Sequence, residues 1–186
     1  MRRINFFKTI FLNLKLRAIK LVVLDFDGVF TDGGLYFGNE NQNFRRFDVK
    51  DGIGIKLLQK ASFEIAIISG SNSEIIDKRA SNLGINIVIK GVANKLKALS
   101  ELQTKLKISK KETLFLGDDI NDLSVIKNVS LFIVPADAHR SCKKVASFIG
   151  KSKGGKGFIR EIAEKLLLAN REDPYKALIT KNEFTK

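Results

Sequence analysis

Two aspartates, Asp25 and Asp27, directly follow a run of apolar residues, and their spacing points to chemistry. Residues 21–24 (LVVL) are typical of a buried strand in a parallel sheet. Because side chains alternate along a strand, both aspartates are expected to leave it on the same side. Two carboxylates this close repel each other unless a cation lies between them or one keeps its proton. The pair suits a carboxylate nucleophile beside a carboxylic acid–base, with a divalent metal ion neutralising the charge.

Polar groups also follow the other predicted strands. Residues 65–68 (IAII) lead into Ser69 and Gly70, and residues 113–116 (TLFL) lead into the acidic segment 117–122 (GDDIND). Lys95 follows a further apolar run at residues 85–90, near the start of a predicted helix. The carboxyl ends of parallel strands lie along one edge of the sheet, where open α/β sheets bind their ligands. We therefore expect these groups to meet at that edge. If Asp25 and Asp27 stood alone, the simpler interpretation would be polar turn residues that end a strand.

Such a set of groups meets the needs of phosphoryl transfer. The transition state of that reaction spreads negative charge over three oxygens, so catalysis depends on positioning and charge neutralisation. Mg²⁺ prefers hard oxygen ligands and keeps several waters, so a few carboxylates, a carbonyl and a phosphate oxygen suffice. The only histidine, His139, and the only cysteine, Cys142, offer no ligand set for zinc, and neither is expected to be catalytic.

These motifs resemble those of the haloacid dehalogenase-like hydrolases. The resemblance covers about residues 20–170 and is carried by residues 25–33 (DFDGVFTDG), Ser69 with Gly70, Lys95, and residues 117–122. Two further segments resemble those of the 3-deoxy-D-manno-octulosonate 8-phosphate phosphatases and their sialic-acid-pathway relatives. These segments are residues 47–55 (FDVKDGIGI) and 154–161 (GGKGFIRE).

The resemblance implies a role for each matching residue. Asp25 is the expected nucleophile that forms an aspartyl-phosphate, and Asp27 is expected to protonate the leaving sugar oxygen and then deprotonate the attacking water. The other implied roles are Mg²⁺ binding by Asp25, Asp118 and the carbonyl of Asp27, support of the metal by Asp119 and Asp122, phosphoryl binding by Ser69, Gly70 and Lys95, and substrate contact by Lys50 and Lys156. Ser71 and Lys156 replace a basic residue and an arginine that are common in these phosphatases, so the identity of the sugar stays open.

Alternating apolar runs and amphipathic stretches predict the fold. About five or six βα units predict one α/β domain with a Rossmann-like parallel sheet and helices on both faces. The predicted domain covers residues 20–170, between a leading basic amphipathic segment at residues 1–19 and a C-terminal tail at residues 171–186. Helices are expected to begin near Gly52, Asn72, Ala93, Asp119 and Gly157.

A β-hairpin is predicted after the first strand, because residues 33–39 (GGLYFGN) alternate and contain turn residues. Capped members of the family insert a lid domain after the first motif or before the lysine, and here those gaps hold only the hairpin and one helix–strand unit. We therefore expect no separate cap domain, and a site that takes a large substrate or is covered by a neighbouring subunit. The resemblance implies a homotetramer, in which the glycines of residues 154–160 would give this segment the reach to approach the next active site.

The net charge of +13 lies in two segments. Residues 1–20 and residues 138–160 contain basic residues and no acid. The second segment is suited to attract an anionic sugar phosphate. The first is interleaved with apolar residues and predicts a helix that packs on the domain or a partner, or that lies on a membrane surface. With one cysteine and no expected membrane span, the chain is predicted to be soluble and cytoplasmic.

Other functions remain open on the sequence alone. The same chemistry would serve a phosphatase of another small molecule, a nucleotide or a nucleic-acid end. A basic nucleic-acid-binding module would need a basic stripe with stacking aromatics, whereas the aromatics here are mostly phenylalanines in core-like runs, so no nucleic-acid partner is expected. A catalytically silent assembly domain would have no need of both Asp25 and Asp27.

Overall fold

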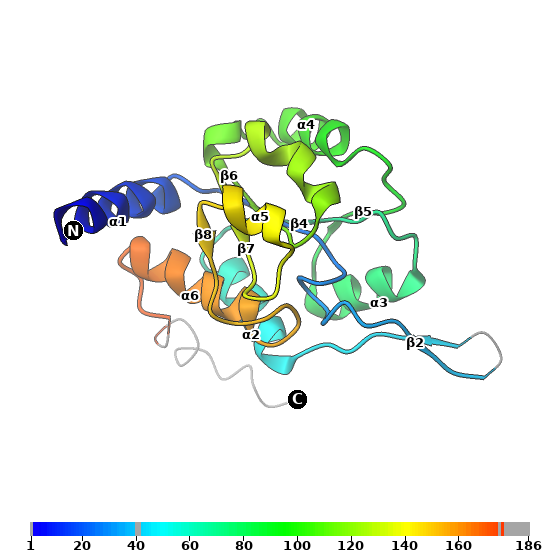
Figure 1. The fold of residues 1–186 in the computed structure, drawn as a ribbon. Coiled ribbons are helices and arrows are strands. Elements are labelled where there is room, and N and C mark those ends of the chain that lie inside the picture. Colours follow the sequence, from blue (N-terminus) through cyan, green and yellow to red (C-terminus); the bar gives the residue numbers. More distant parts are fainter. Residues whose placement is uncertain (1, 40–41, 175, 177–186) are drawn as a thin grey trace.

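The central sheet confirms the predicted fold class. The computed structural model describes residues 2–39, 42–174 and 176, with the backbone alone for residues 2–9. Six strands form one sheet in the order β5-β4-β1-β6-β7-β8 (Figure 1). Every neighbouring pair is parallel. The strands are β1 (Leu21–Leu24), β4 (Glu64–Ile68), β5 (Ile87–Ile89), β6 (Thr113–Leu116), β7 (Leu131–Val134) and β8 (Phe148–Ile149).

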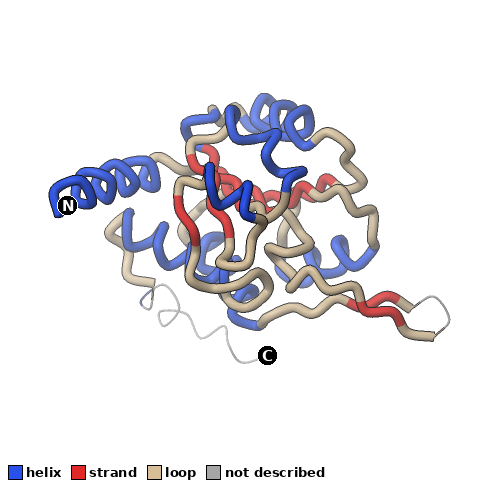
Figure 2. Tube along the Cα trace, in the orientation of Figure 1, coloured by secondary structure: helices blue, strands red, loops and turns tan. Residues whose placement is uncertain are grey.

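Helices cover both faces of this sheet, as expected (Figures 1 and 2). In β1, Val22 and Leu24 belong to one core cluster and Leu21 and Val23 to the other, because successive side chains point to opposite faces. The first core is closed by α2 (Val49–Lys60), α3 (Glu74–Leu83) and α6 (Phe158–Ala169). The second is closed by α4 (Lys95–Leu106), η2 (Ile120–Asn128) and α5 (Arg140–Val145). A short 3₁₀ turn, η1 (Lys110–Glu112), precedes β6.

Several helices begin close to the predicted positions, and polar side chains cap their N-termini. Asp48, Ser73 and Asn94 accept hydrogen bonds from backbone N–H groups in the first turns of α2, α3 and α4. The segment after Asp119 also begins where expected, but η2 is a 3₁₀ helix. Its first turn is held by Asp119 and by the carboxylate of Asp122, which turns back to the chain before the helix.

The predicted hairpin is present and projects from the domain (Figure 2). Strands β2 (Tyr36–Phe37) and β3 (Asn43–Phe44) pair antiparallel, and both are exposed. The base of the hairpin is fixed by an antiparallel bridge from Thr31 to Phe47 and by edge-to-face contacts of the Phe47 ring with Phe26 and Phe30. Within the residues that the structure describes, no cap domain accompanies this hairpin.

The leading segment forms α1 (Arg2–Arg17), whose Leu16 is buried in the first core. No helix among the described residues is long and apolar enough to cross a bilayer. Most of the predicted C-terminal tail, residues 171–186, lies outside the described residues.

The glycine-rich segment at residues 154–160 lies against its own subunit. A Cβ on Gly154 would lie 1.8 Å from the carbonyl oxygen of Gly28, and the N–H of Gly155 donates to the Val29 carbonyl at 3.0 Å. The buried carboxylate of Asp51 accepts N–H groups from the start of α6, including that of Ile159 at 2.8 Å. The glycines permit close packing against the loop that follows β1, and the approach of this segment to a neighbouring active site stays a prediction.

Candidate active site

Asp25 and Lys95 form a buried ion pair at the carboxyl edge of the sheet. Asp25 follows β1 directly and is 6% exposed, and Lys95, the first residue of α4, is 3% exposed. The Lys95 ammonium donates to Oδ1 of Asp25 at 2.7 Å and to Oδ1 of Asp122 at 2.6 Å. Lys95 therefore joins the predicted nucleophile to the acidic segment, and its contact with a phosphoryl group remains a prediction.

Asp118 and Asp122 complete an acidic cluster with Asp25. The other carboxylate oxygen of Asp122 accepts the backbone N–H groups of Asp118 and Asp119 at 2.9 and 3.3 Å, which fixes the loop after β6. Carboxylate oxygens of Asp25, Asp118 and Asp122 lie within 4.8 Å of one another. Oδ1 of Asp118 is buried and has no hydrogen-bond partner in the described part of the chain. Hard oxygen donors with an unsatisfied buried oxygen fit a divalent cation such as Mg²⁺.

The raised pKa values of the acidic cluster point to missing positive charge. Burial and the charge of Asp122 raise the pKa of Asp25 to about 6, although Lys95 acts to lower it. Burial, with the charges of Asp25, Asp122 and Asp119, raises the pKa of Asp118 to about 8. Burial alone would lower the pKa of Lys95, but the charges of Asp25 and Asp122 reverse this and raise it. One ammonium thus leaves the carboxylates incompletely neutralised, and a bound cation would supply the rest.

This charge imbalance predicts how the stability of the metal-free protein depends on pH. An unfolded aspartate has a pKa of about 3.9. Between that value and the raised values of about 6 and about 8, the folded state binds more protons than the unfolded state. Stability must therefore fall as pH rises through this window. We expect the melting temperature in chelator to fall between about pH 6 and pH 8, and Mg²⁺ to reverse the fall.

The matched control for this measurement is Asp118→Asn, which removes the aspartate of the cluster whose pKa is raised further. Its melting temperature in chelator is expected to vary less with pH than that of the unsubstituted protein. A melting temperature of the unsubstituted protein that stays level or rises over the same pH range would contradict the charge imbalance.

Asp27 lies beside this cluster and is oriented by groups outside it. Arg45 Nε donates to its Oδ1 at 3.0 Å, and the Thr31 hydroxyl donates to the same oxygen at 3.3 Å. The Arg45 side chain is only 10% exposed. The sequence interpretation missed Arg45, because no motif marks it; the only signal is the basic pair Arg45 and Arg46 where the hairpin rejoins the domain.

Asp25 and Asp27 open onto a cavity of about 350 Å³. Ser69 is 2% exposed, and its hydroxyl oxygen accepts the backbone N–H of Ser71 at 3.1 Å, which leaves the hydroxyl hydrogen for a ligand. Asp119 caps η2 with its side chain and also borders the cavity. The lining residues are Asp25, Asp27, Gly33, Ser69, Gly70, Ser71, Asp118, Asp119 and Asn121. The sequence-predicted catalytic, phosphate-binding and metal-binding groups are thus brought together.

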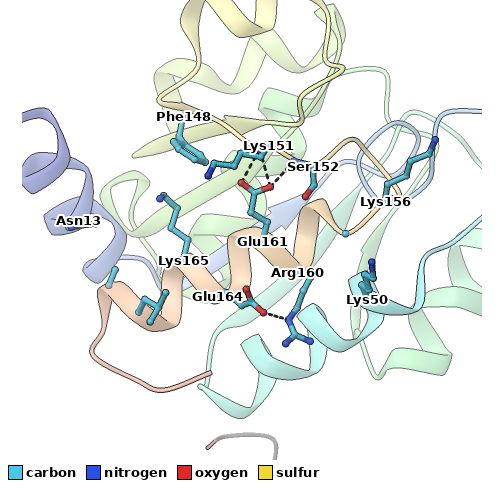
Figure 3. Close-up of a pocket in the computed structure, with 13 residues that line it drawn as sticks. Asn13, Lys50, Phe148, Lys151, Ser152, Lys156, Arg160, Glu161, Glu164 and Lys165 are labelled. Atoms are coloured by element: carbon cyan, nitrogen blue, oxygen red, sulfur yellow. Dashed lines mark hydrogen bonds and ion pairs between the residues drawn. The ribbon is translucent and has the colours of Figure 1, made fainter. Parts of the chain in front are cut away.

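Lys50 and Lys156 lie elsewhere. Both border a different pocket of about 650 Å³, beside α6 (Figure 3). The two pockets share no lining residue. Within one subunit, α2 and the segment before α6 present these lysines outside the catalytic cavity, and their contact with substrate stays a prediction.

Gly28 allows the loop after β1 to approach the acidic cluster. Its φ is +86°, and a Cβ at this position would lie 2.1 Å from Oδ2 of Asp118. We expect Gly28→Ala to displace that carboxylate and to weaken divalent-metal binding and activity strongly. Gly33→Ala is the matched control, because Gly33 also has a positive φ, +74°, but has no heavy atom closer than 3.6 Å to its Cβ position. Isothermal titration with Mg²⁺ checks both variants, and equal losses would contradict the role given to Gly28.

Comparisons with known proteins agree with this geometry. Residues 50–162 match the model of a family described as haloacid dehalogenase-like hydrolase. The chain is 38% identical over 155 residues to 3-deoxy-D-manno-octulosonate 8-phosphate phosphatase KdsC of Escherichia coli K12, covering 83% of this chain and 82% of that protein. The corresponding enzyme of Yersinia pestis is 36% identical over 151 residues, which are 81% of each protein.

Solved structures show the same likeness. The Yersinia pestis 3-deoxy-D-manno-octulosonate 8-phosphate phosphatase superposes with a TM-score of 0.85 at 34% identity, covering 87% of this chain and 88% of that one. The Moraxella catarrhalis phosphatase, solved in complex with a magnesium ion, a phosphate ion and a KDO molecule, gives 0.86 at 33% identity over 90% of this chain and 97% of that one. The chain belongs to the haloacid dehalogenase-like hydrolase family, and its relatives identify it as a phosphatase of that family.

Proposed function

We propose that the protein is a Mg²⁺-dependent phosphomonoesterase that releases phosphate from 3-deoxy-D-manno-octulosonate 8-phosphate or a nine-carbon sialic-type analogue. The observation that carries the proposal is the cavity in which Asp25, Asp27 and Ser69 meet the acidic cluster. The relative from Moraxella catarrhalis, which was solved with magnesium, phosphate and KDO, supports both the metal and the substrate class. We place the enzyme in the cytoplasm, where such a sugar phosphate would be a soluble substrate.

In the proposed mechanism, Asp25 attacks phosphorus, and Asp27 acts first as a general acid and then as a general base. A carboxylate oxygen of Asp25 forms a bond to phosphorus while the bond from phosphorus to the sugar oxygen breaks, and Asp27 gives its proton to that oxygen. Water then attacks the aspartyl-phosphate, its proton passes to Asp27, and phosphate leaves with Asp25 restored. Arg45 and Thr31 hold Asp27 toward the cavity for both transfers.

The remaining groups stabilise negative charge and transfer no proton. Lys95 keeps Asp25 ionised and aligned, because its ammonium holds Oδ1 at 2.7 Å. Ser69 is placed to donate its hydroxyl hydrogen to a phosphoryl oxygen. A magnesium ion held by Asp25, Asp118 and the carbonyl of Asp27, when bound, neutralises the negative charge of the phosphoryl group.

We also propose that the enzyme is a homotetramer whose hairpins complete the sites. The cavity has no cap within the described chain, and the hairpin exposes apolar side chains that need a partner, with Phe37 75% exposed. A second copy that covers this hairpin would shield the reacting groups from water. The partner's basic pocket around Lys50 and Lys156 is then a candidate for contact with the substrate's carboxylate.

The proposed function is tested by measuring phosphate released from a substrate panel. The panel contains 3-deoxy-D-manno-octulosonate 8-phosphate, a nine-carbon keto sugar acid phosphate, a neutral hexose phosphate, a nucleoside monophosphate and p-nitrophenyl phosphate. We expect kcat/KM to be highest for a keto sugar acid phosphate and activity to vanish in excess chelator and return with Mg²⁺. A preference for the nucleotide or the neutral sugar would overturn the substrate class, and full activity in chelator would overturn the metal-dependent mechanism.

A further inference from the structure

Helix α1 is anchored to the domain by one side of its last turns. Leu16 is fully buried in the core, and Leu12 packs against the same cluster. Arg17 Nε donates to the carbonyl of Ala169 at the end of α6, at 2.7 Å. The rest of α1 extends away from the sheet (Figure 1). The last part of α1 is therefore held in a defined orientation, with one face toward the domain and another toward solvent.

The other face of these turns carries exposed apolar side chains. Ile10, Phe11 and Leu14 are 41%, 61% and 56% exposed. Spacings of three and four residues place them together on one side of a helix. They are not the residues that hold α1 on the domain, because that contact is made by Leu12 and Leu16. A large aromatic and two aliphatic side chains on one exposed face are therefore left for a partner.

The charge of the segment argues for an anionic partner. Residues 1–20 contain six basic residues, Arg2, Arg3, Lys8, Lys15, Arg17 and Lys20, and no acid. The ammonium of Lys15 lies 4.9 Å from the centre of the Phe11 ring, so a cation stands next to the apolar face. Pairing of α1 with α1 of a second copy would bring these like charges together. A nucleic acid would satisfy the charge but would leave the aliphatic side chains without an apolar environment.

Helix α1 adjoins the pocket in Figure 3, because Asn13 of α1 is one of its lining residues. Several of the other lining residues are basic, so the pocket extends the basic surface of α1. The two glutamates there are already engaged: Glu161 accepts the backbone N–H of Lys151, and Glu164 pairs with Arg160 at 2.6 Å. Among the described residues, the ammonium of Lys151 has no carboxylate partner. On the rim, Leu168 of α6 is 64% exposed. The pocket thus repeats the combination of cations and exposed apolar surface found on α1.

We propose that the exposed face of α1 and the basic pocket beside it bind an anionic lipid surface. Ile10, Phe11 and Leu14 enter the boundary between headgroups and acyl chains. Lys15 beside this face and Lys151 and Lys165 of the pocket neutralise lipid phosphates. The end of the pocket bordered by Asn13, Lys151 and Lys165 accommodates a phosphate-bearing headgroup next to the inserted helix (Figure 3). Lys50 and Lys156, at the other end, are left for the substrate contact proposed above.

This mode of binding leaves the catalytic cavity open. Helix α1 leads into the amino end of β1, whereas Asp25 follows the carboxyl end of the same strand. The exposed face of α1 and the catalytic cavity therefore lie toward opposite edges of the sheet. Binding to lipid is expected to place the enzyme on the membrane surface without changing its turnover of a soluble substrate.

The test is co-sedimentation of the full chain with vesicles. We expect binding to vesicles that contain phosphatidylglycerol, little binding to phosphatidylcholine alone, and weaker binding at high salt. The double variant Phe11→Ser/Leu14→Ser should reduce binding to the anionic vesicles by more than about tenfold, since insertion depends on apolar area. The double variant Lys151→Gln/Lys165→Gln should also reduce binding to the anionic vesicles, because it removes two cations that line the pocket. Phe37→Ser is the matched control, because it removes an exposed aromatic from the hairpin and should leave lipid binding intact.

Phosphate release and the sedimentation coefficient separate this proposal from the alternatives. The Phe11→Ser/Leu14→Ser variant should keep the turnover, melting temperature and oligomeric state of the unsubstituted protein. Equal binding of the variant and the unsubstituted protein to anionic vesicles, or equal binding to neutral and anionic vesicles, would overturn the proposal. A change in oligomeric state with lipid binding intact would overturn it as well, because α1 would then cover a second copy of the chain.

Discussion

Replacing Asp25 by asparagine is expected to abolish turnover while leaving the fold intact. The amide cannot form the bond to phosphorus, and no other carboxylate occupies its position at the end of β1. The substitution also removes a negative charge from a cluster that Lys95 alone does not neutralise, so the metal-free protein should be no less stable than before. Steady-state phosphate release and thermal unfolding of the same preparation provide the measurement.

Asp77→Asn is the matched control for Asp25→Asn. Asp77 pairs with Lys90 at the surface, away from the cavity, so its loss should leave the rate unchanged. Activity of the Asp25→Asn variant within about tenfold of the unsubstituted enzyme would correspond to a loss of only about 1.4 kcal/mol of transition-state stabilisation. Such a result would remove Asp25 as the nucleophile.

Asp27→Asn is expected to slow the reaction in a different way. The proposed nucleophile stays in place, but the group proposed to protonate the leaving oxygen and to activate water is lost. Loss of such an acid–base group typically costs about 10²–10⁴-fold in rate. If hydrolysis slows more than attack, the phosphorylated enzyme accumulates. Rapid quenching followed by intact-mass measurement would detect it.

Arg45→Ala provides a comparison for the Asp27 experiment, because it removes the cation that orients Asp27 but keeps the carboxylate. Its rate should fall between those of the unsubstituted enzyme and the Asp27→Asn variant. Equal rates for Asp27→Asn and the unsubstituted enzyme would exclude Asp27 from the mechanism.

The position of the catalytic groups could be predicted from the sequence because a parallel sheet aligns its strand ends. Asp25, Ser69 and Asp118 each follow an apolar run, and the pairing of β1 with β4 and β6 brings all three to one edge. The sequence order of strands and helices was therefore enough to assemble the cavity. The ion pair between Lys95 and Asp122 could not be predicted, because it depends on how α4 and η2 pack against each other.

Other features depend on packing that local sequence does not encode. Arg45 reaches Asp27 only because the hairpin returns to the domain beside the loop after β1. The glycines at residues 154–155 have the composition of a flexible segment, yet their missing side chains serve close contact with that same loop. Lys156 follows them and borders the pocket beside α6 rather than the catalytic cavity.

The most direct test of the account is chemical trapping of the phosphorylated residue. The enzyme is mixed with Mg²⁺ and 3-deoxy-D-manno-octulosonate 8-phosphate, quenched in acid and treated with borohydride, which reduces an acyl phosphate to an alcohol and so converts the aspartate to homoserine. Peptide mass spectrometry then locates the changed residue. We expect homoserine at position 25, more of it in the Asp27→Asn variant, and none without substrate. Homoserine at another position, or none in any sample that releases phosphate, would contradict it.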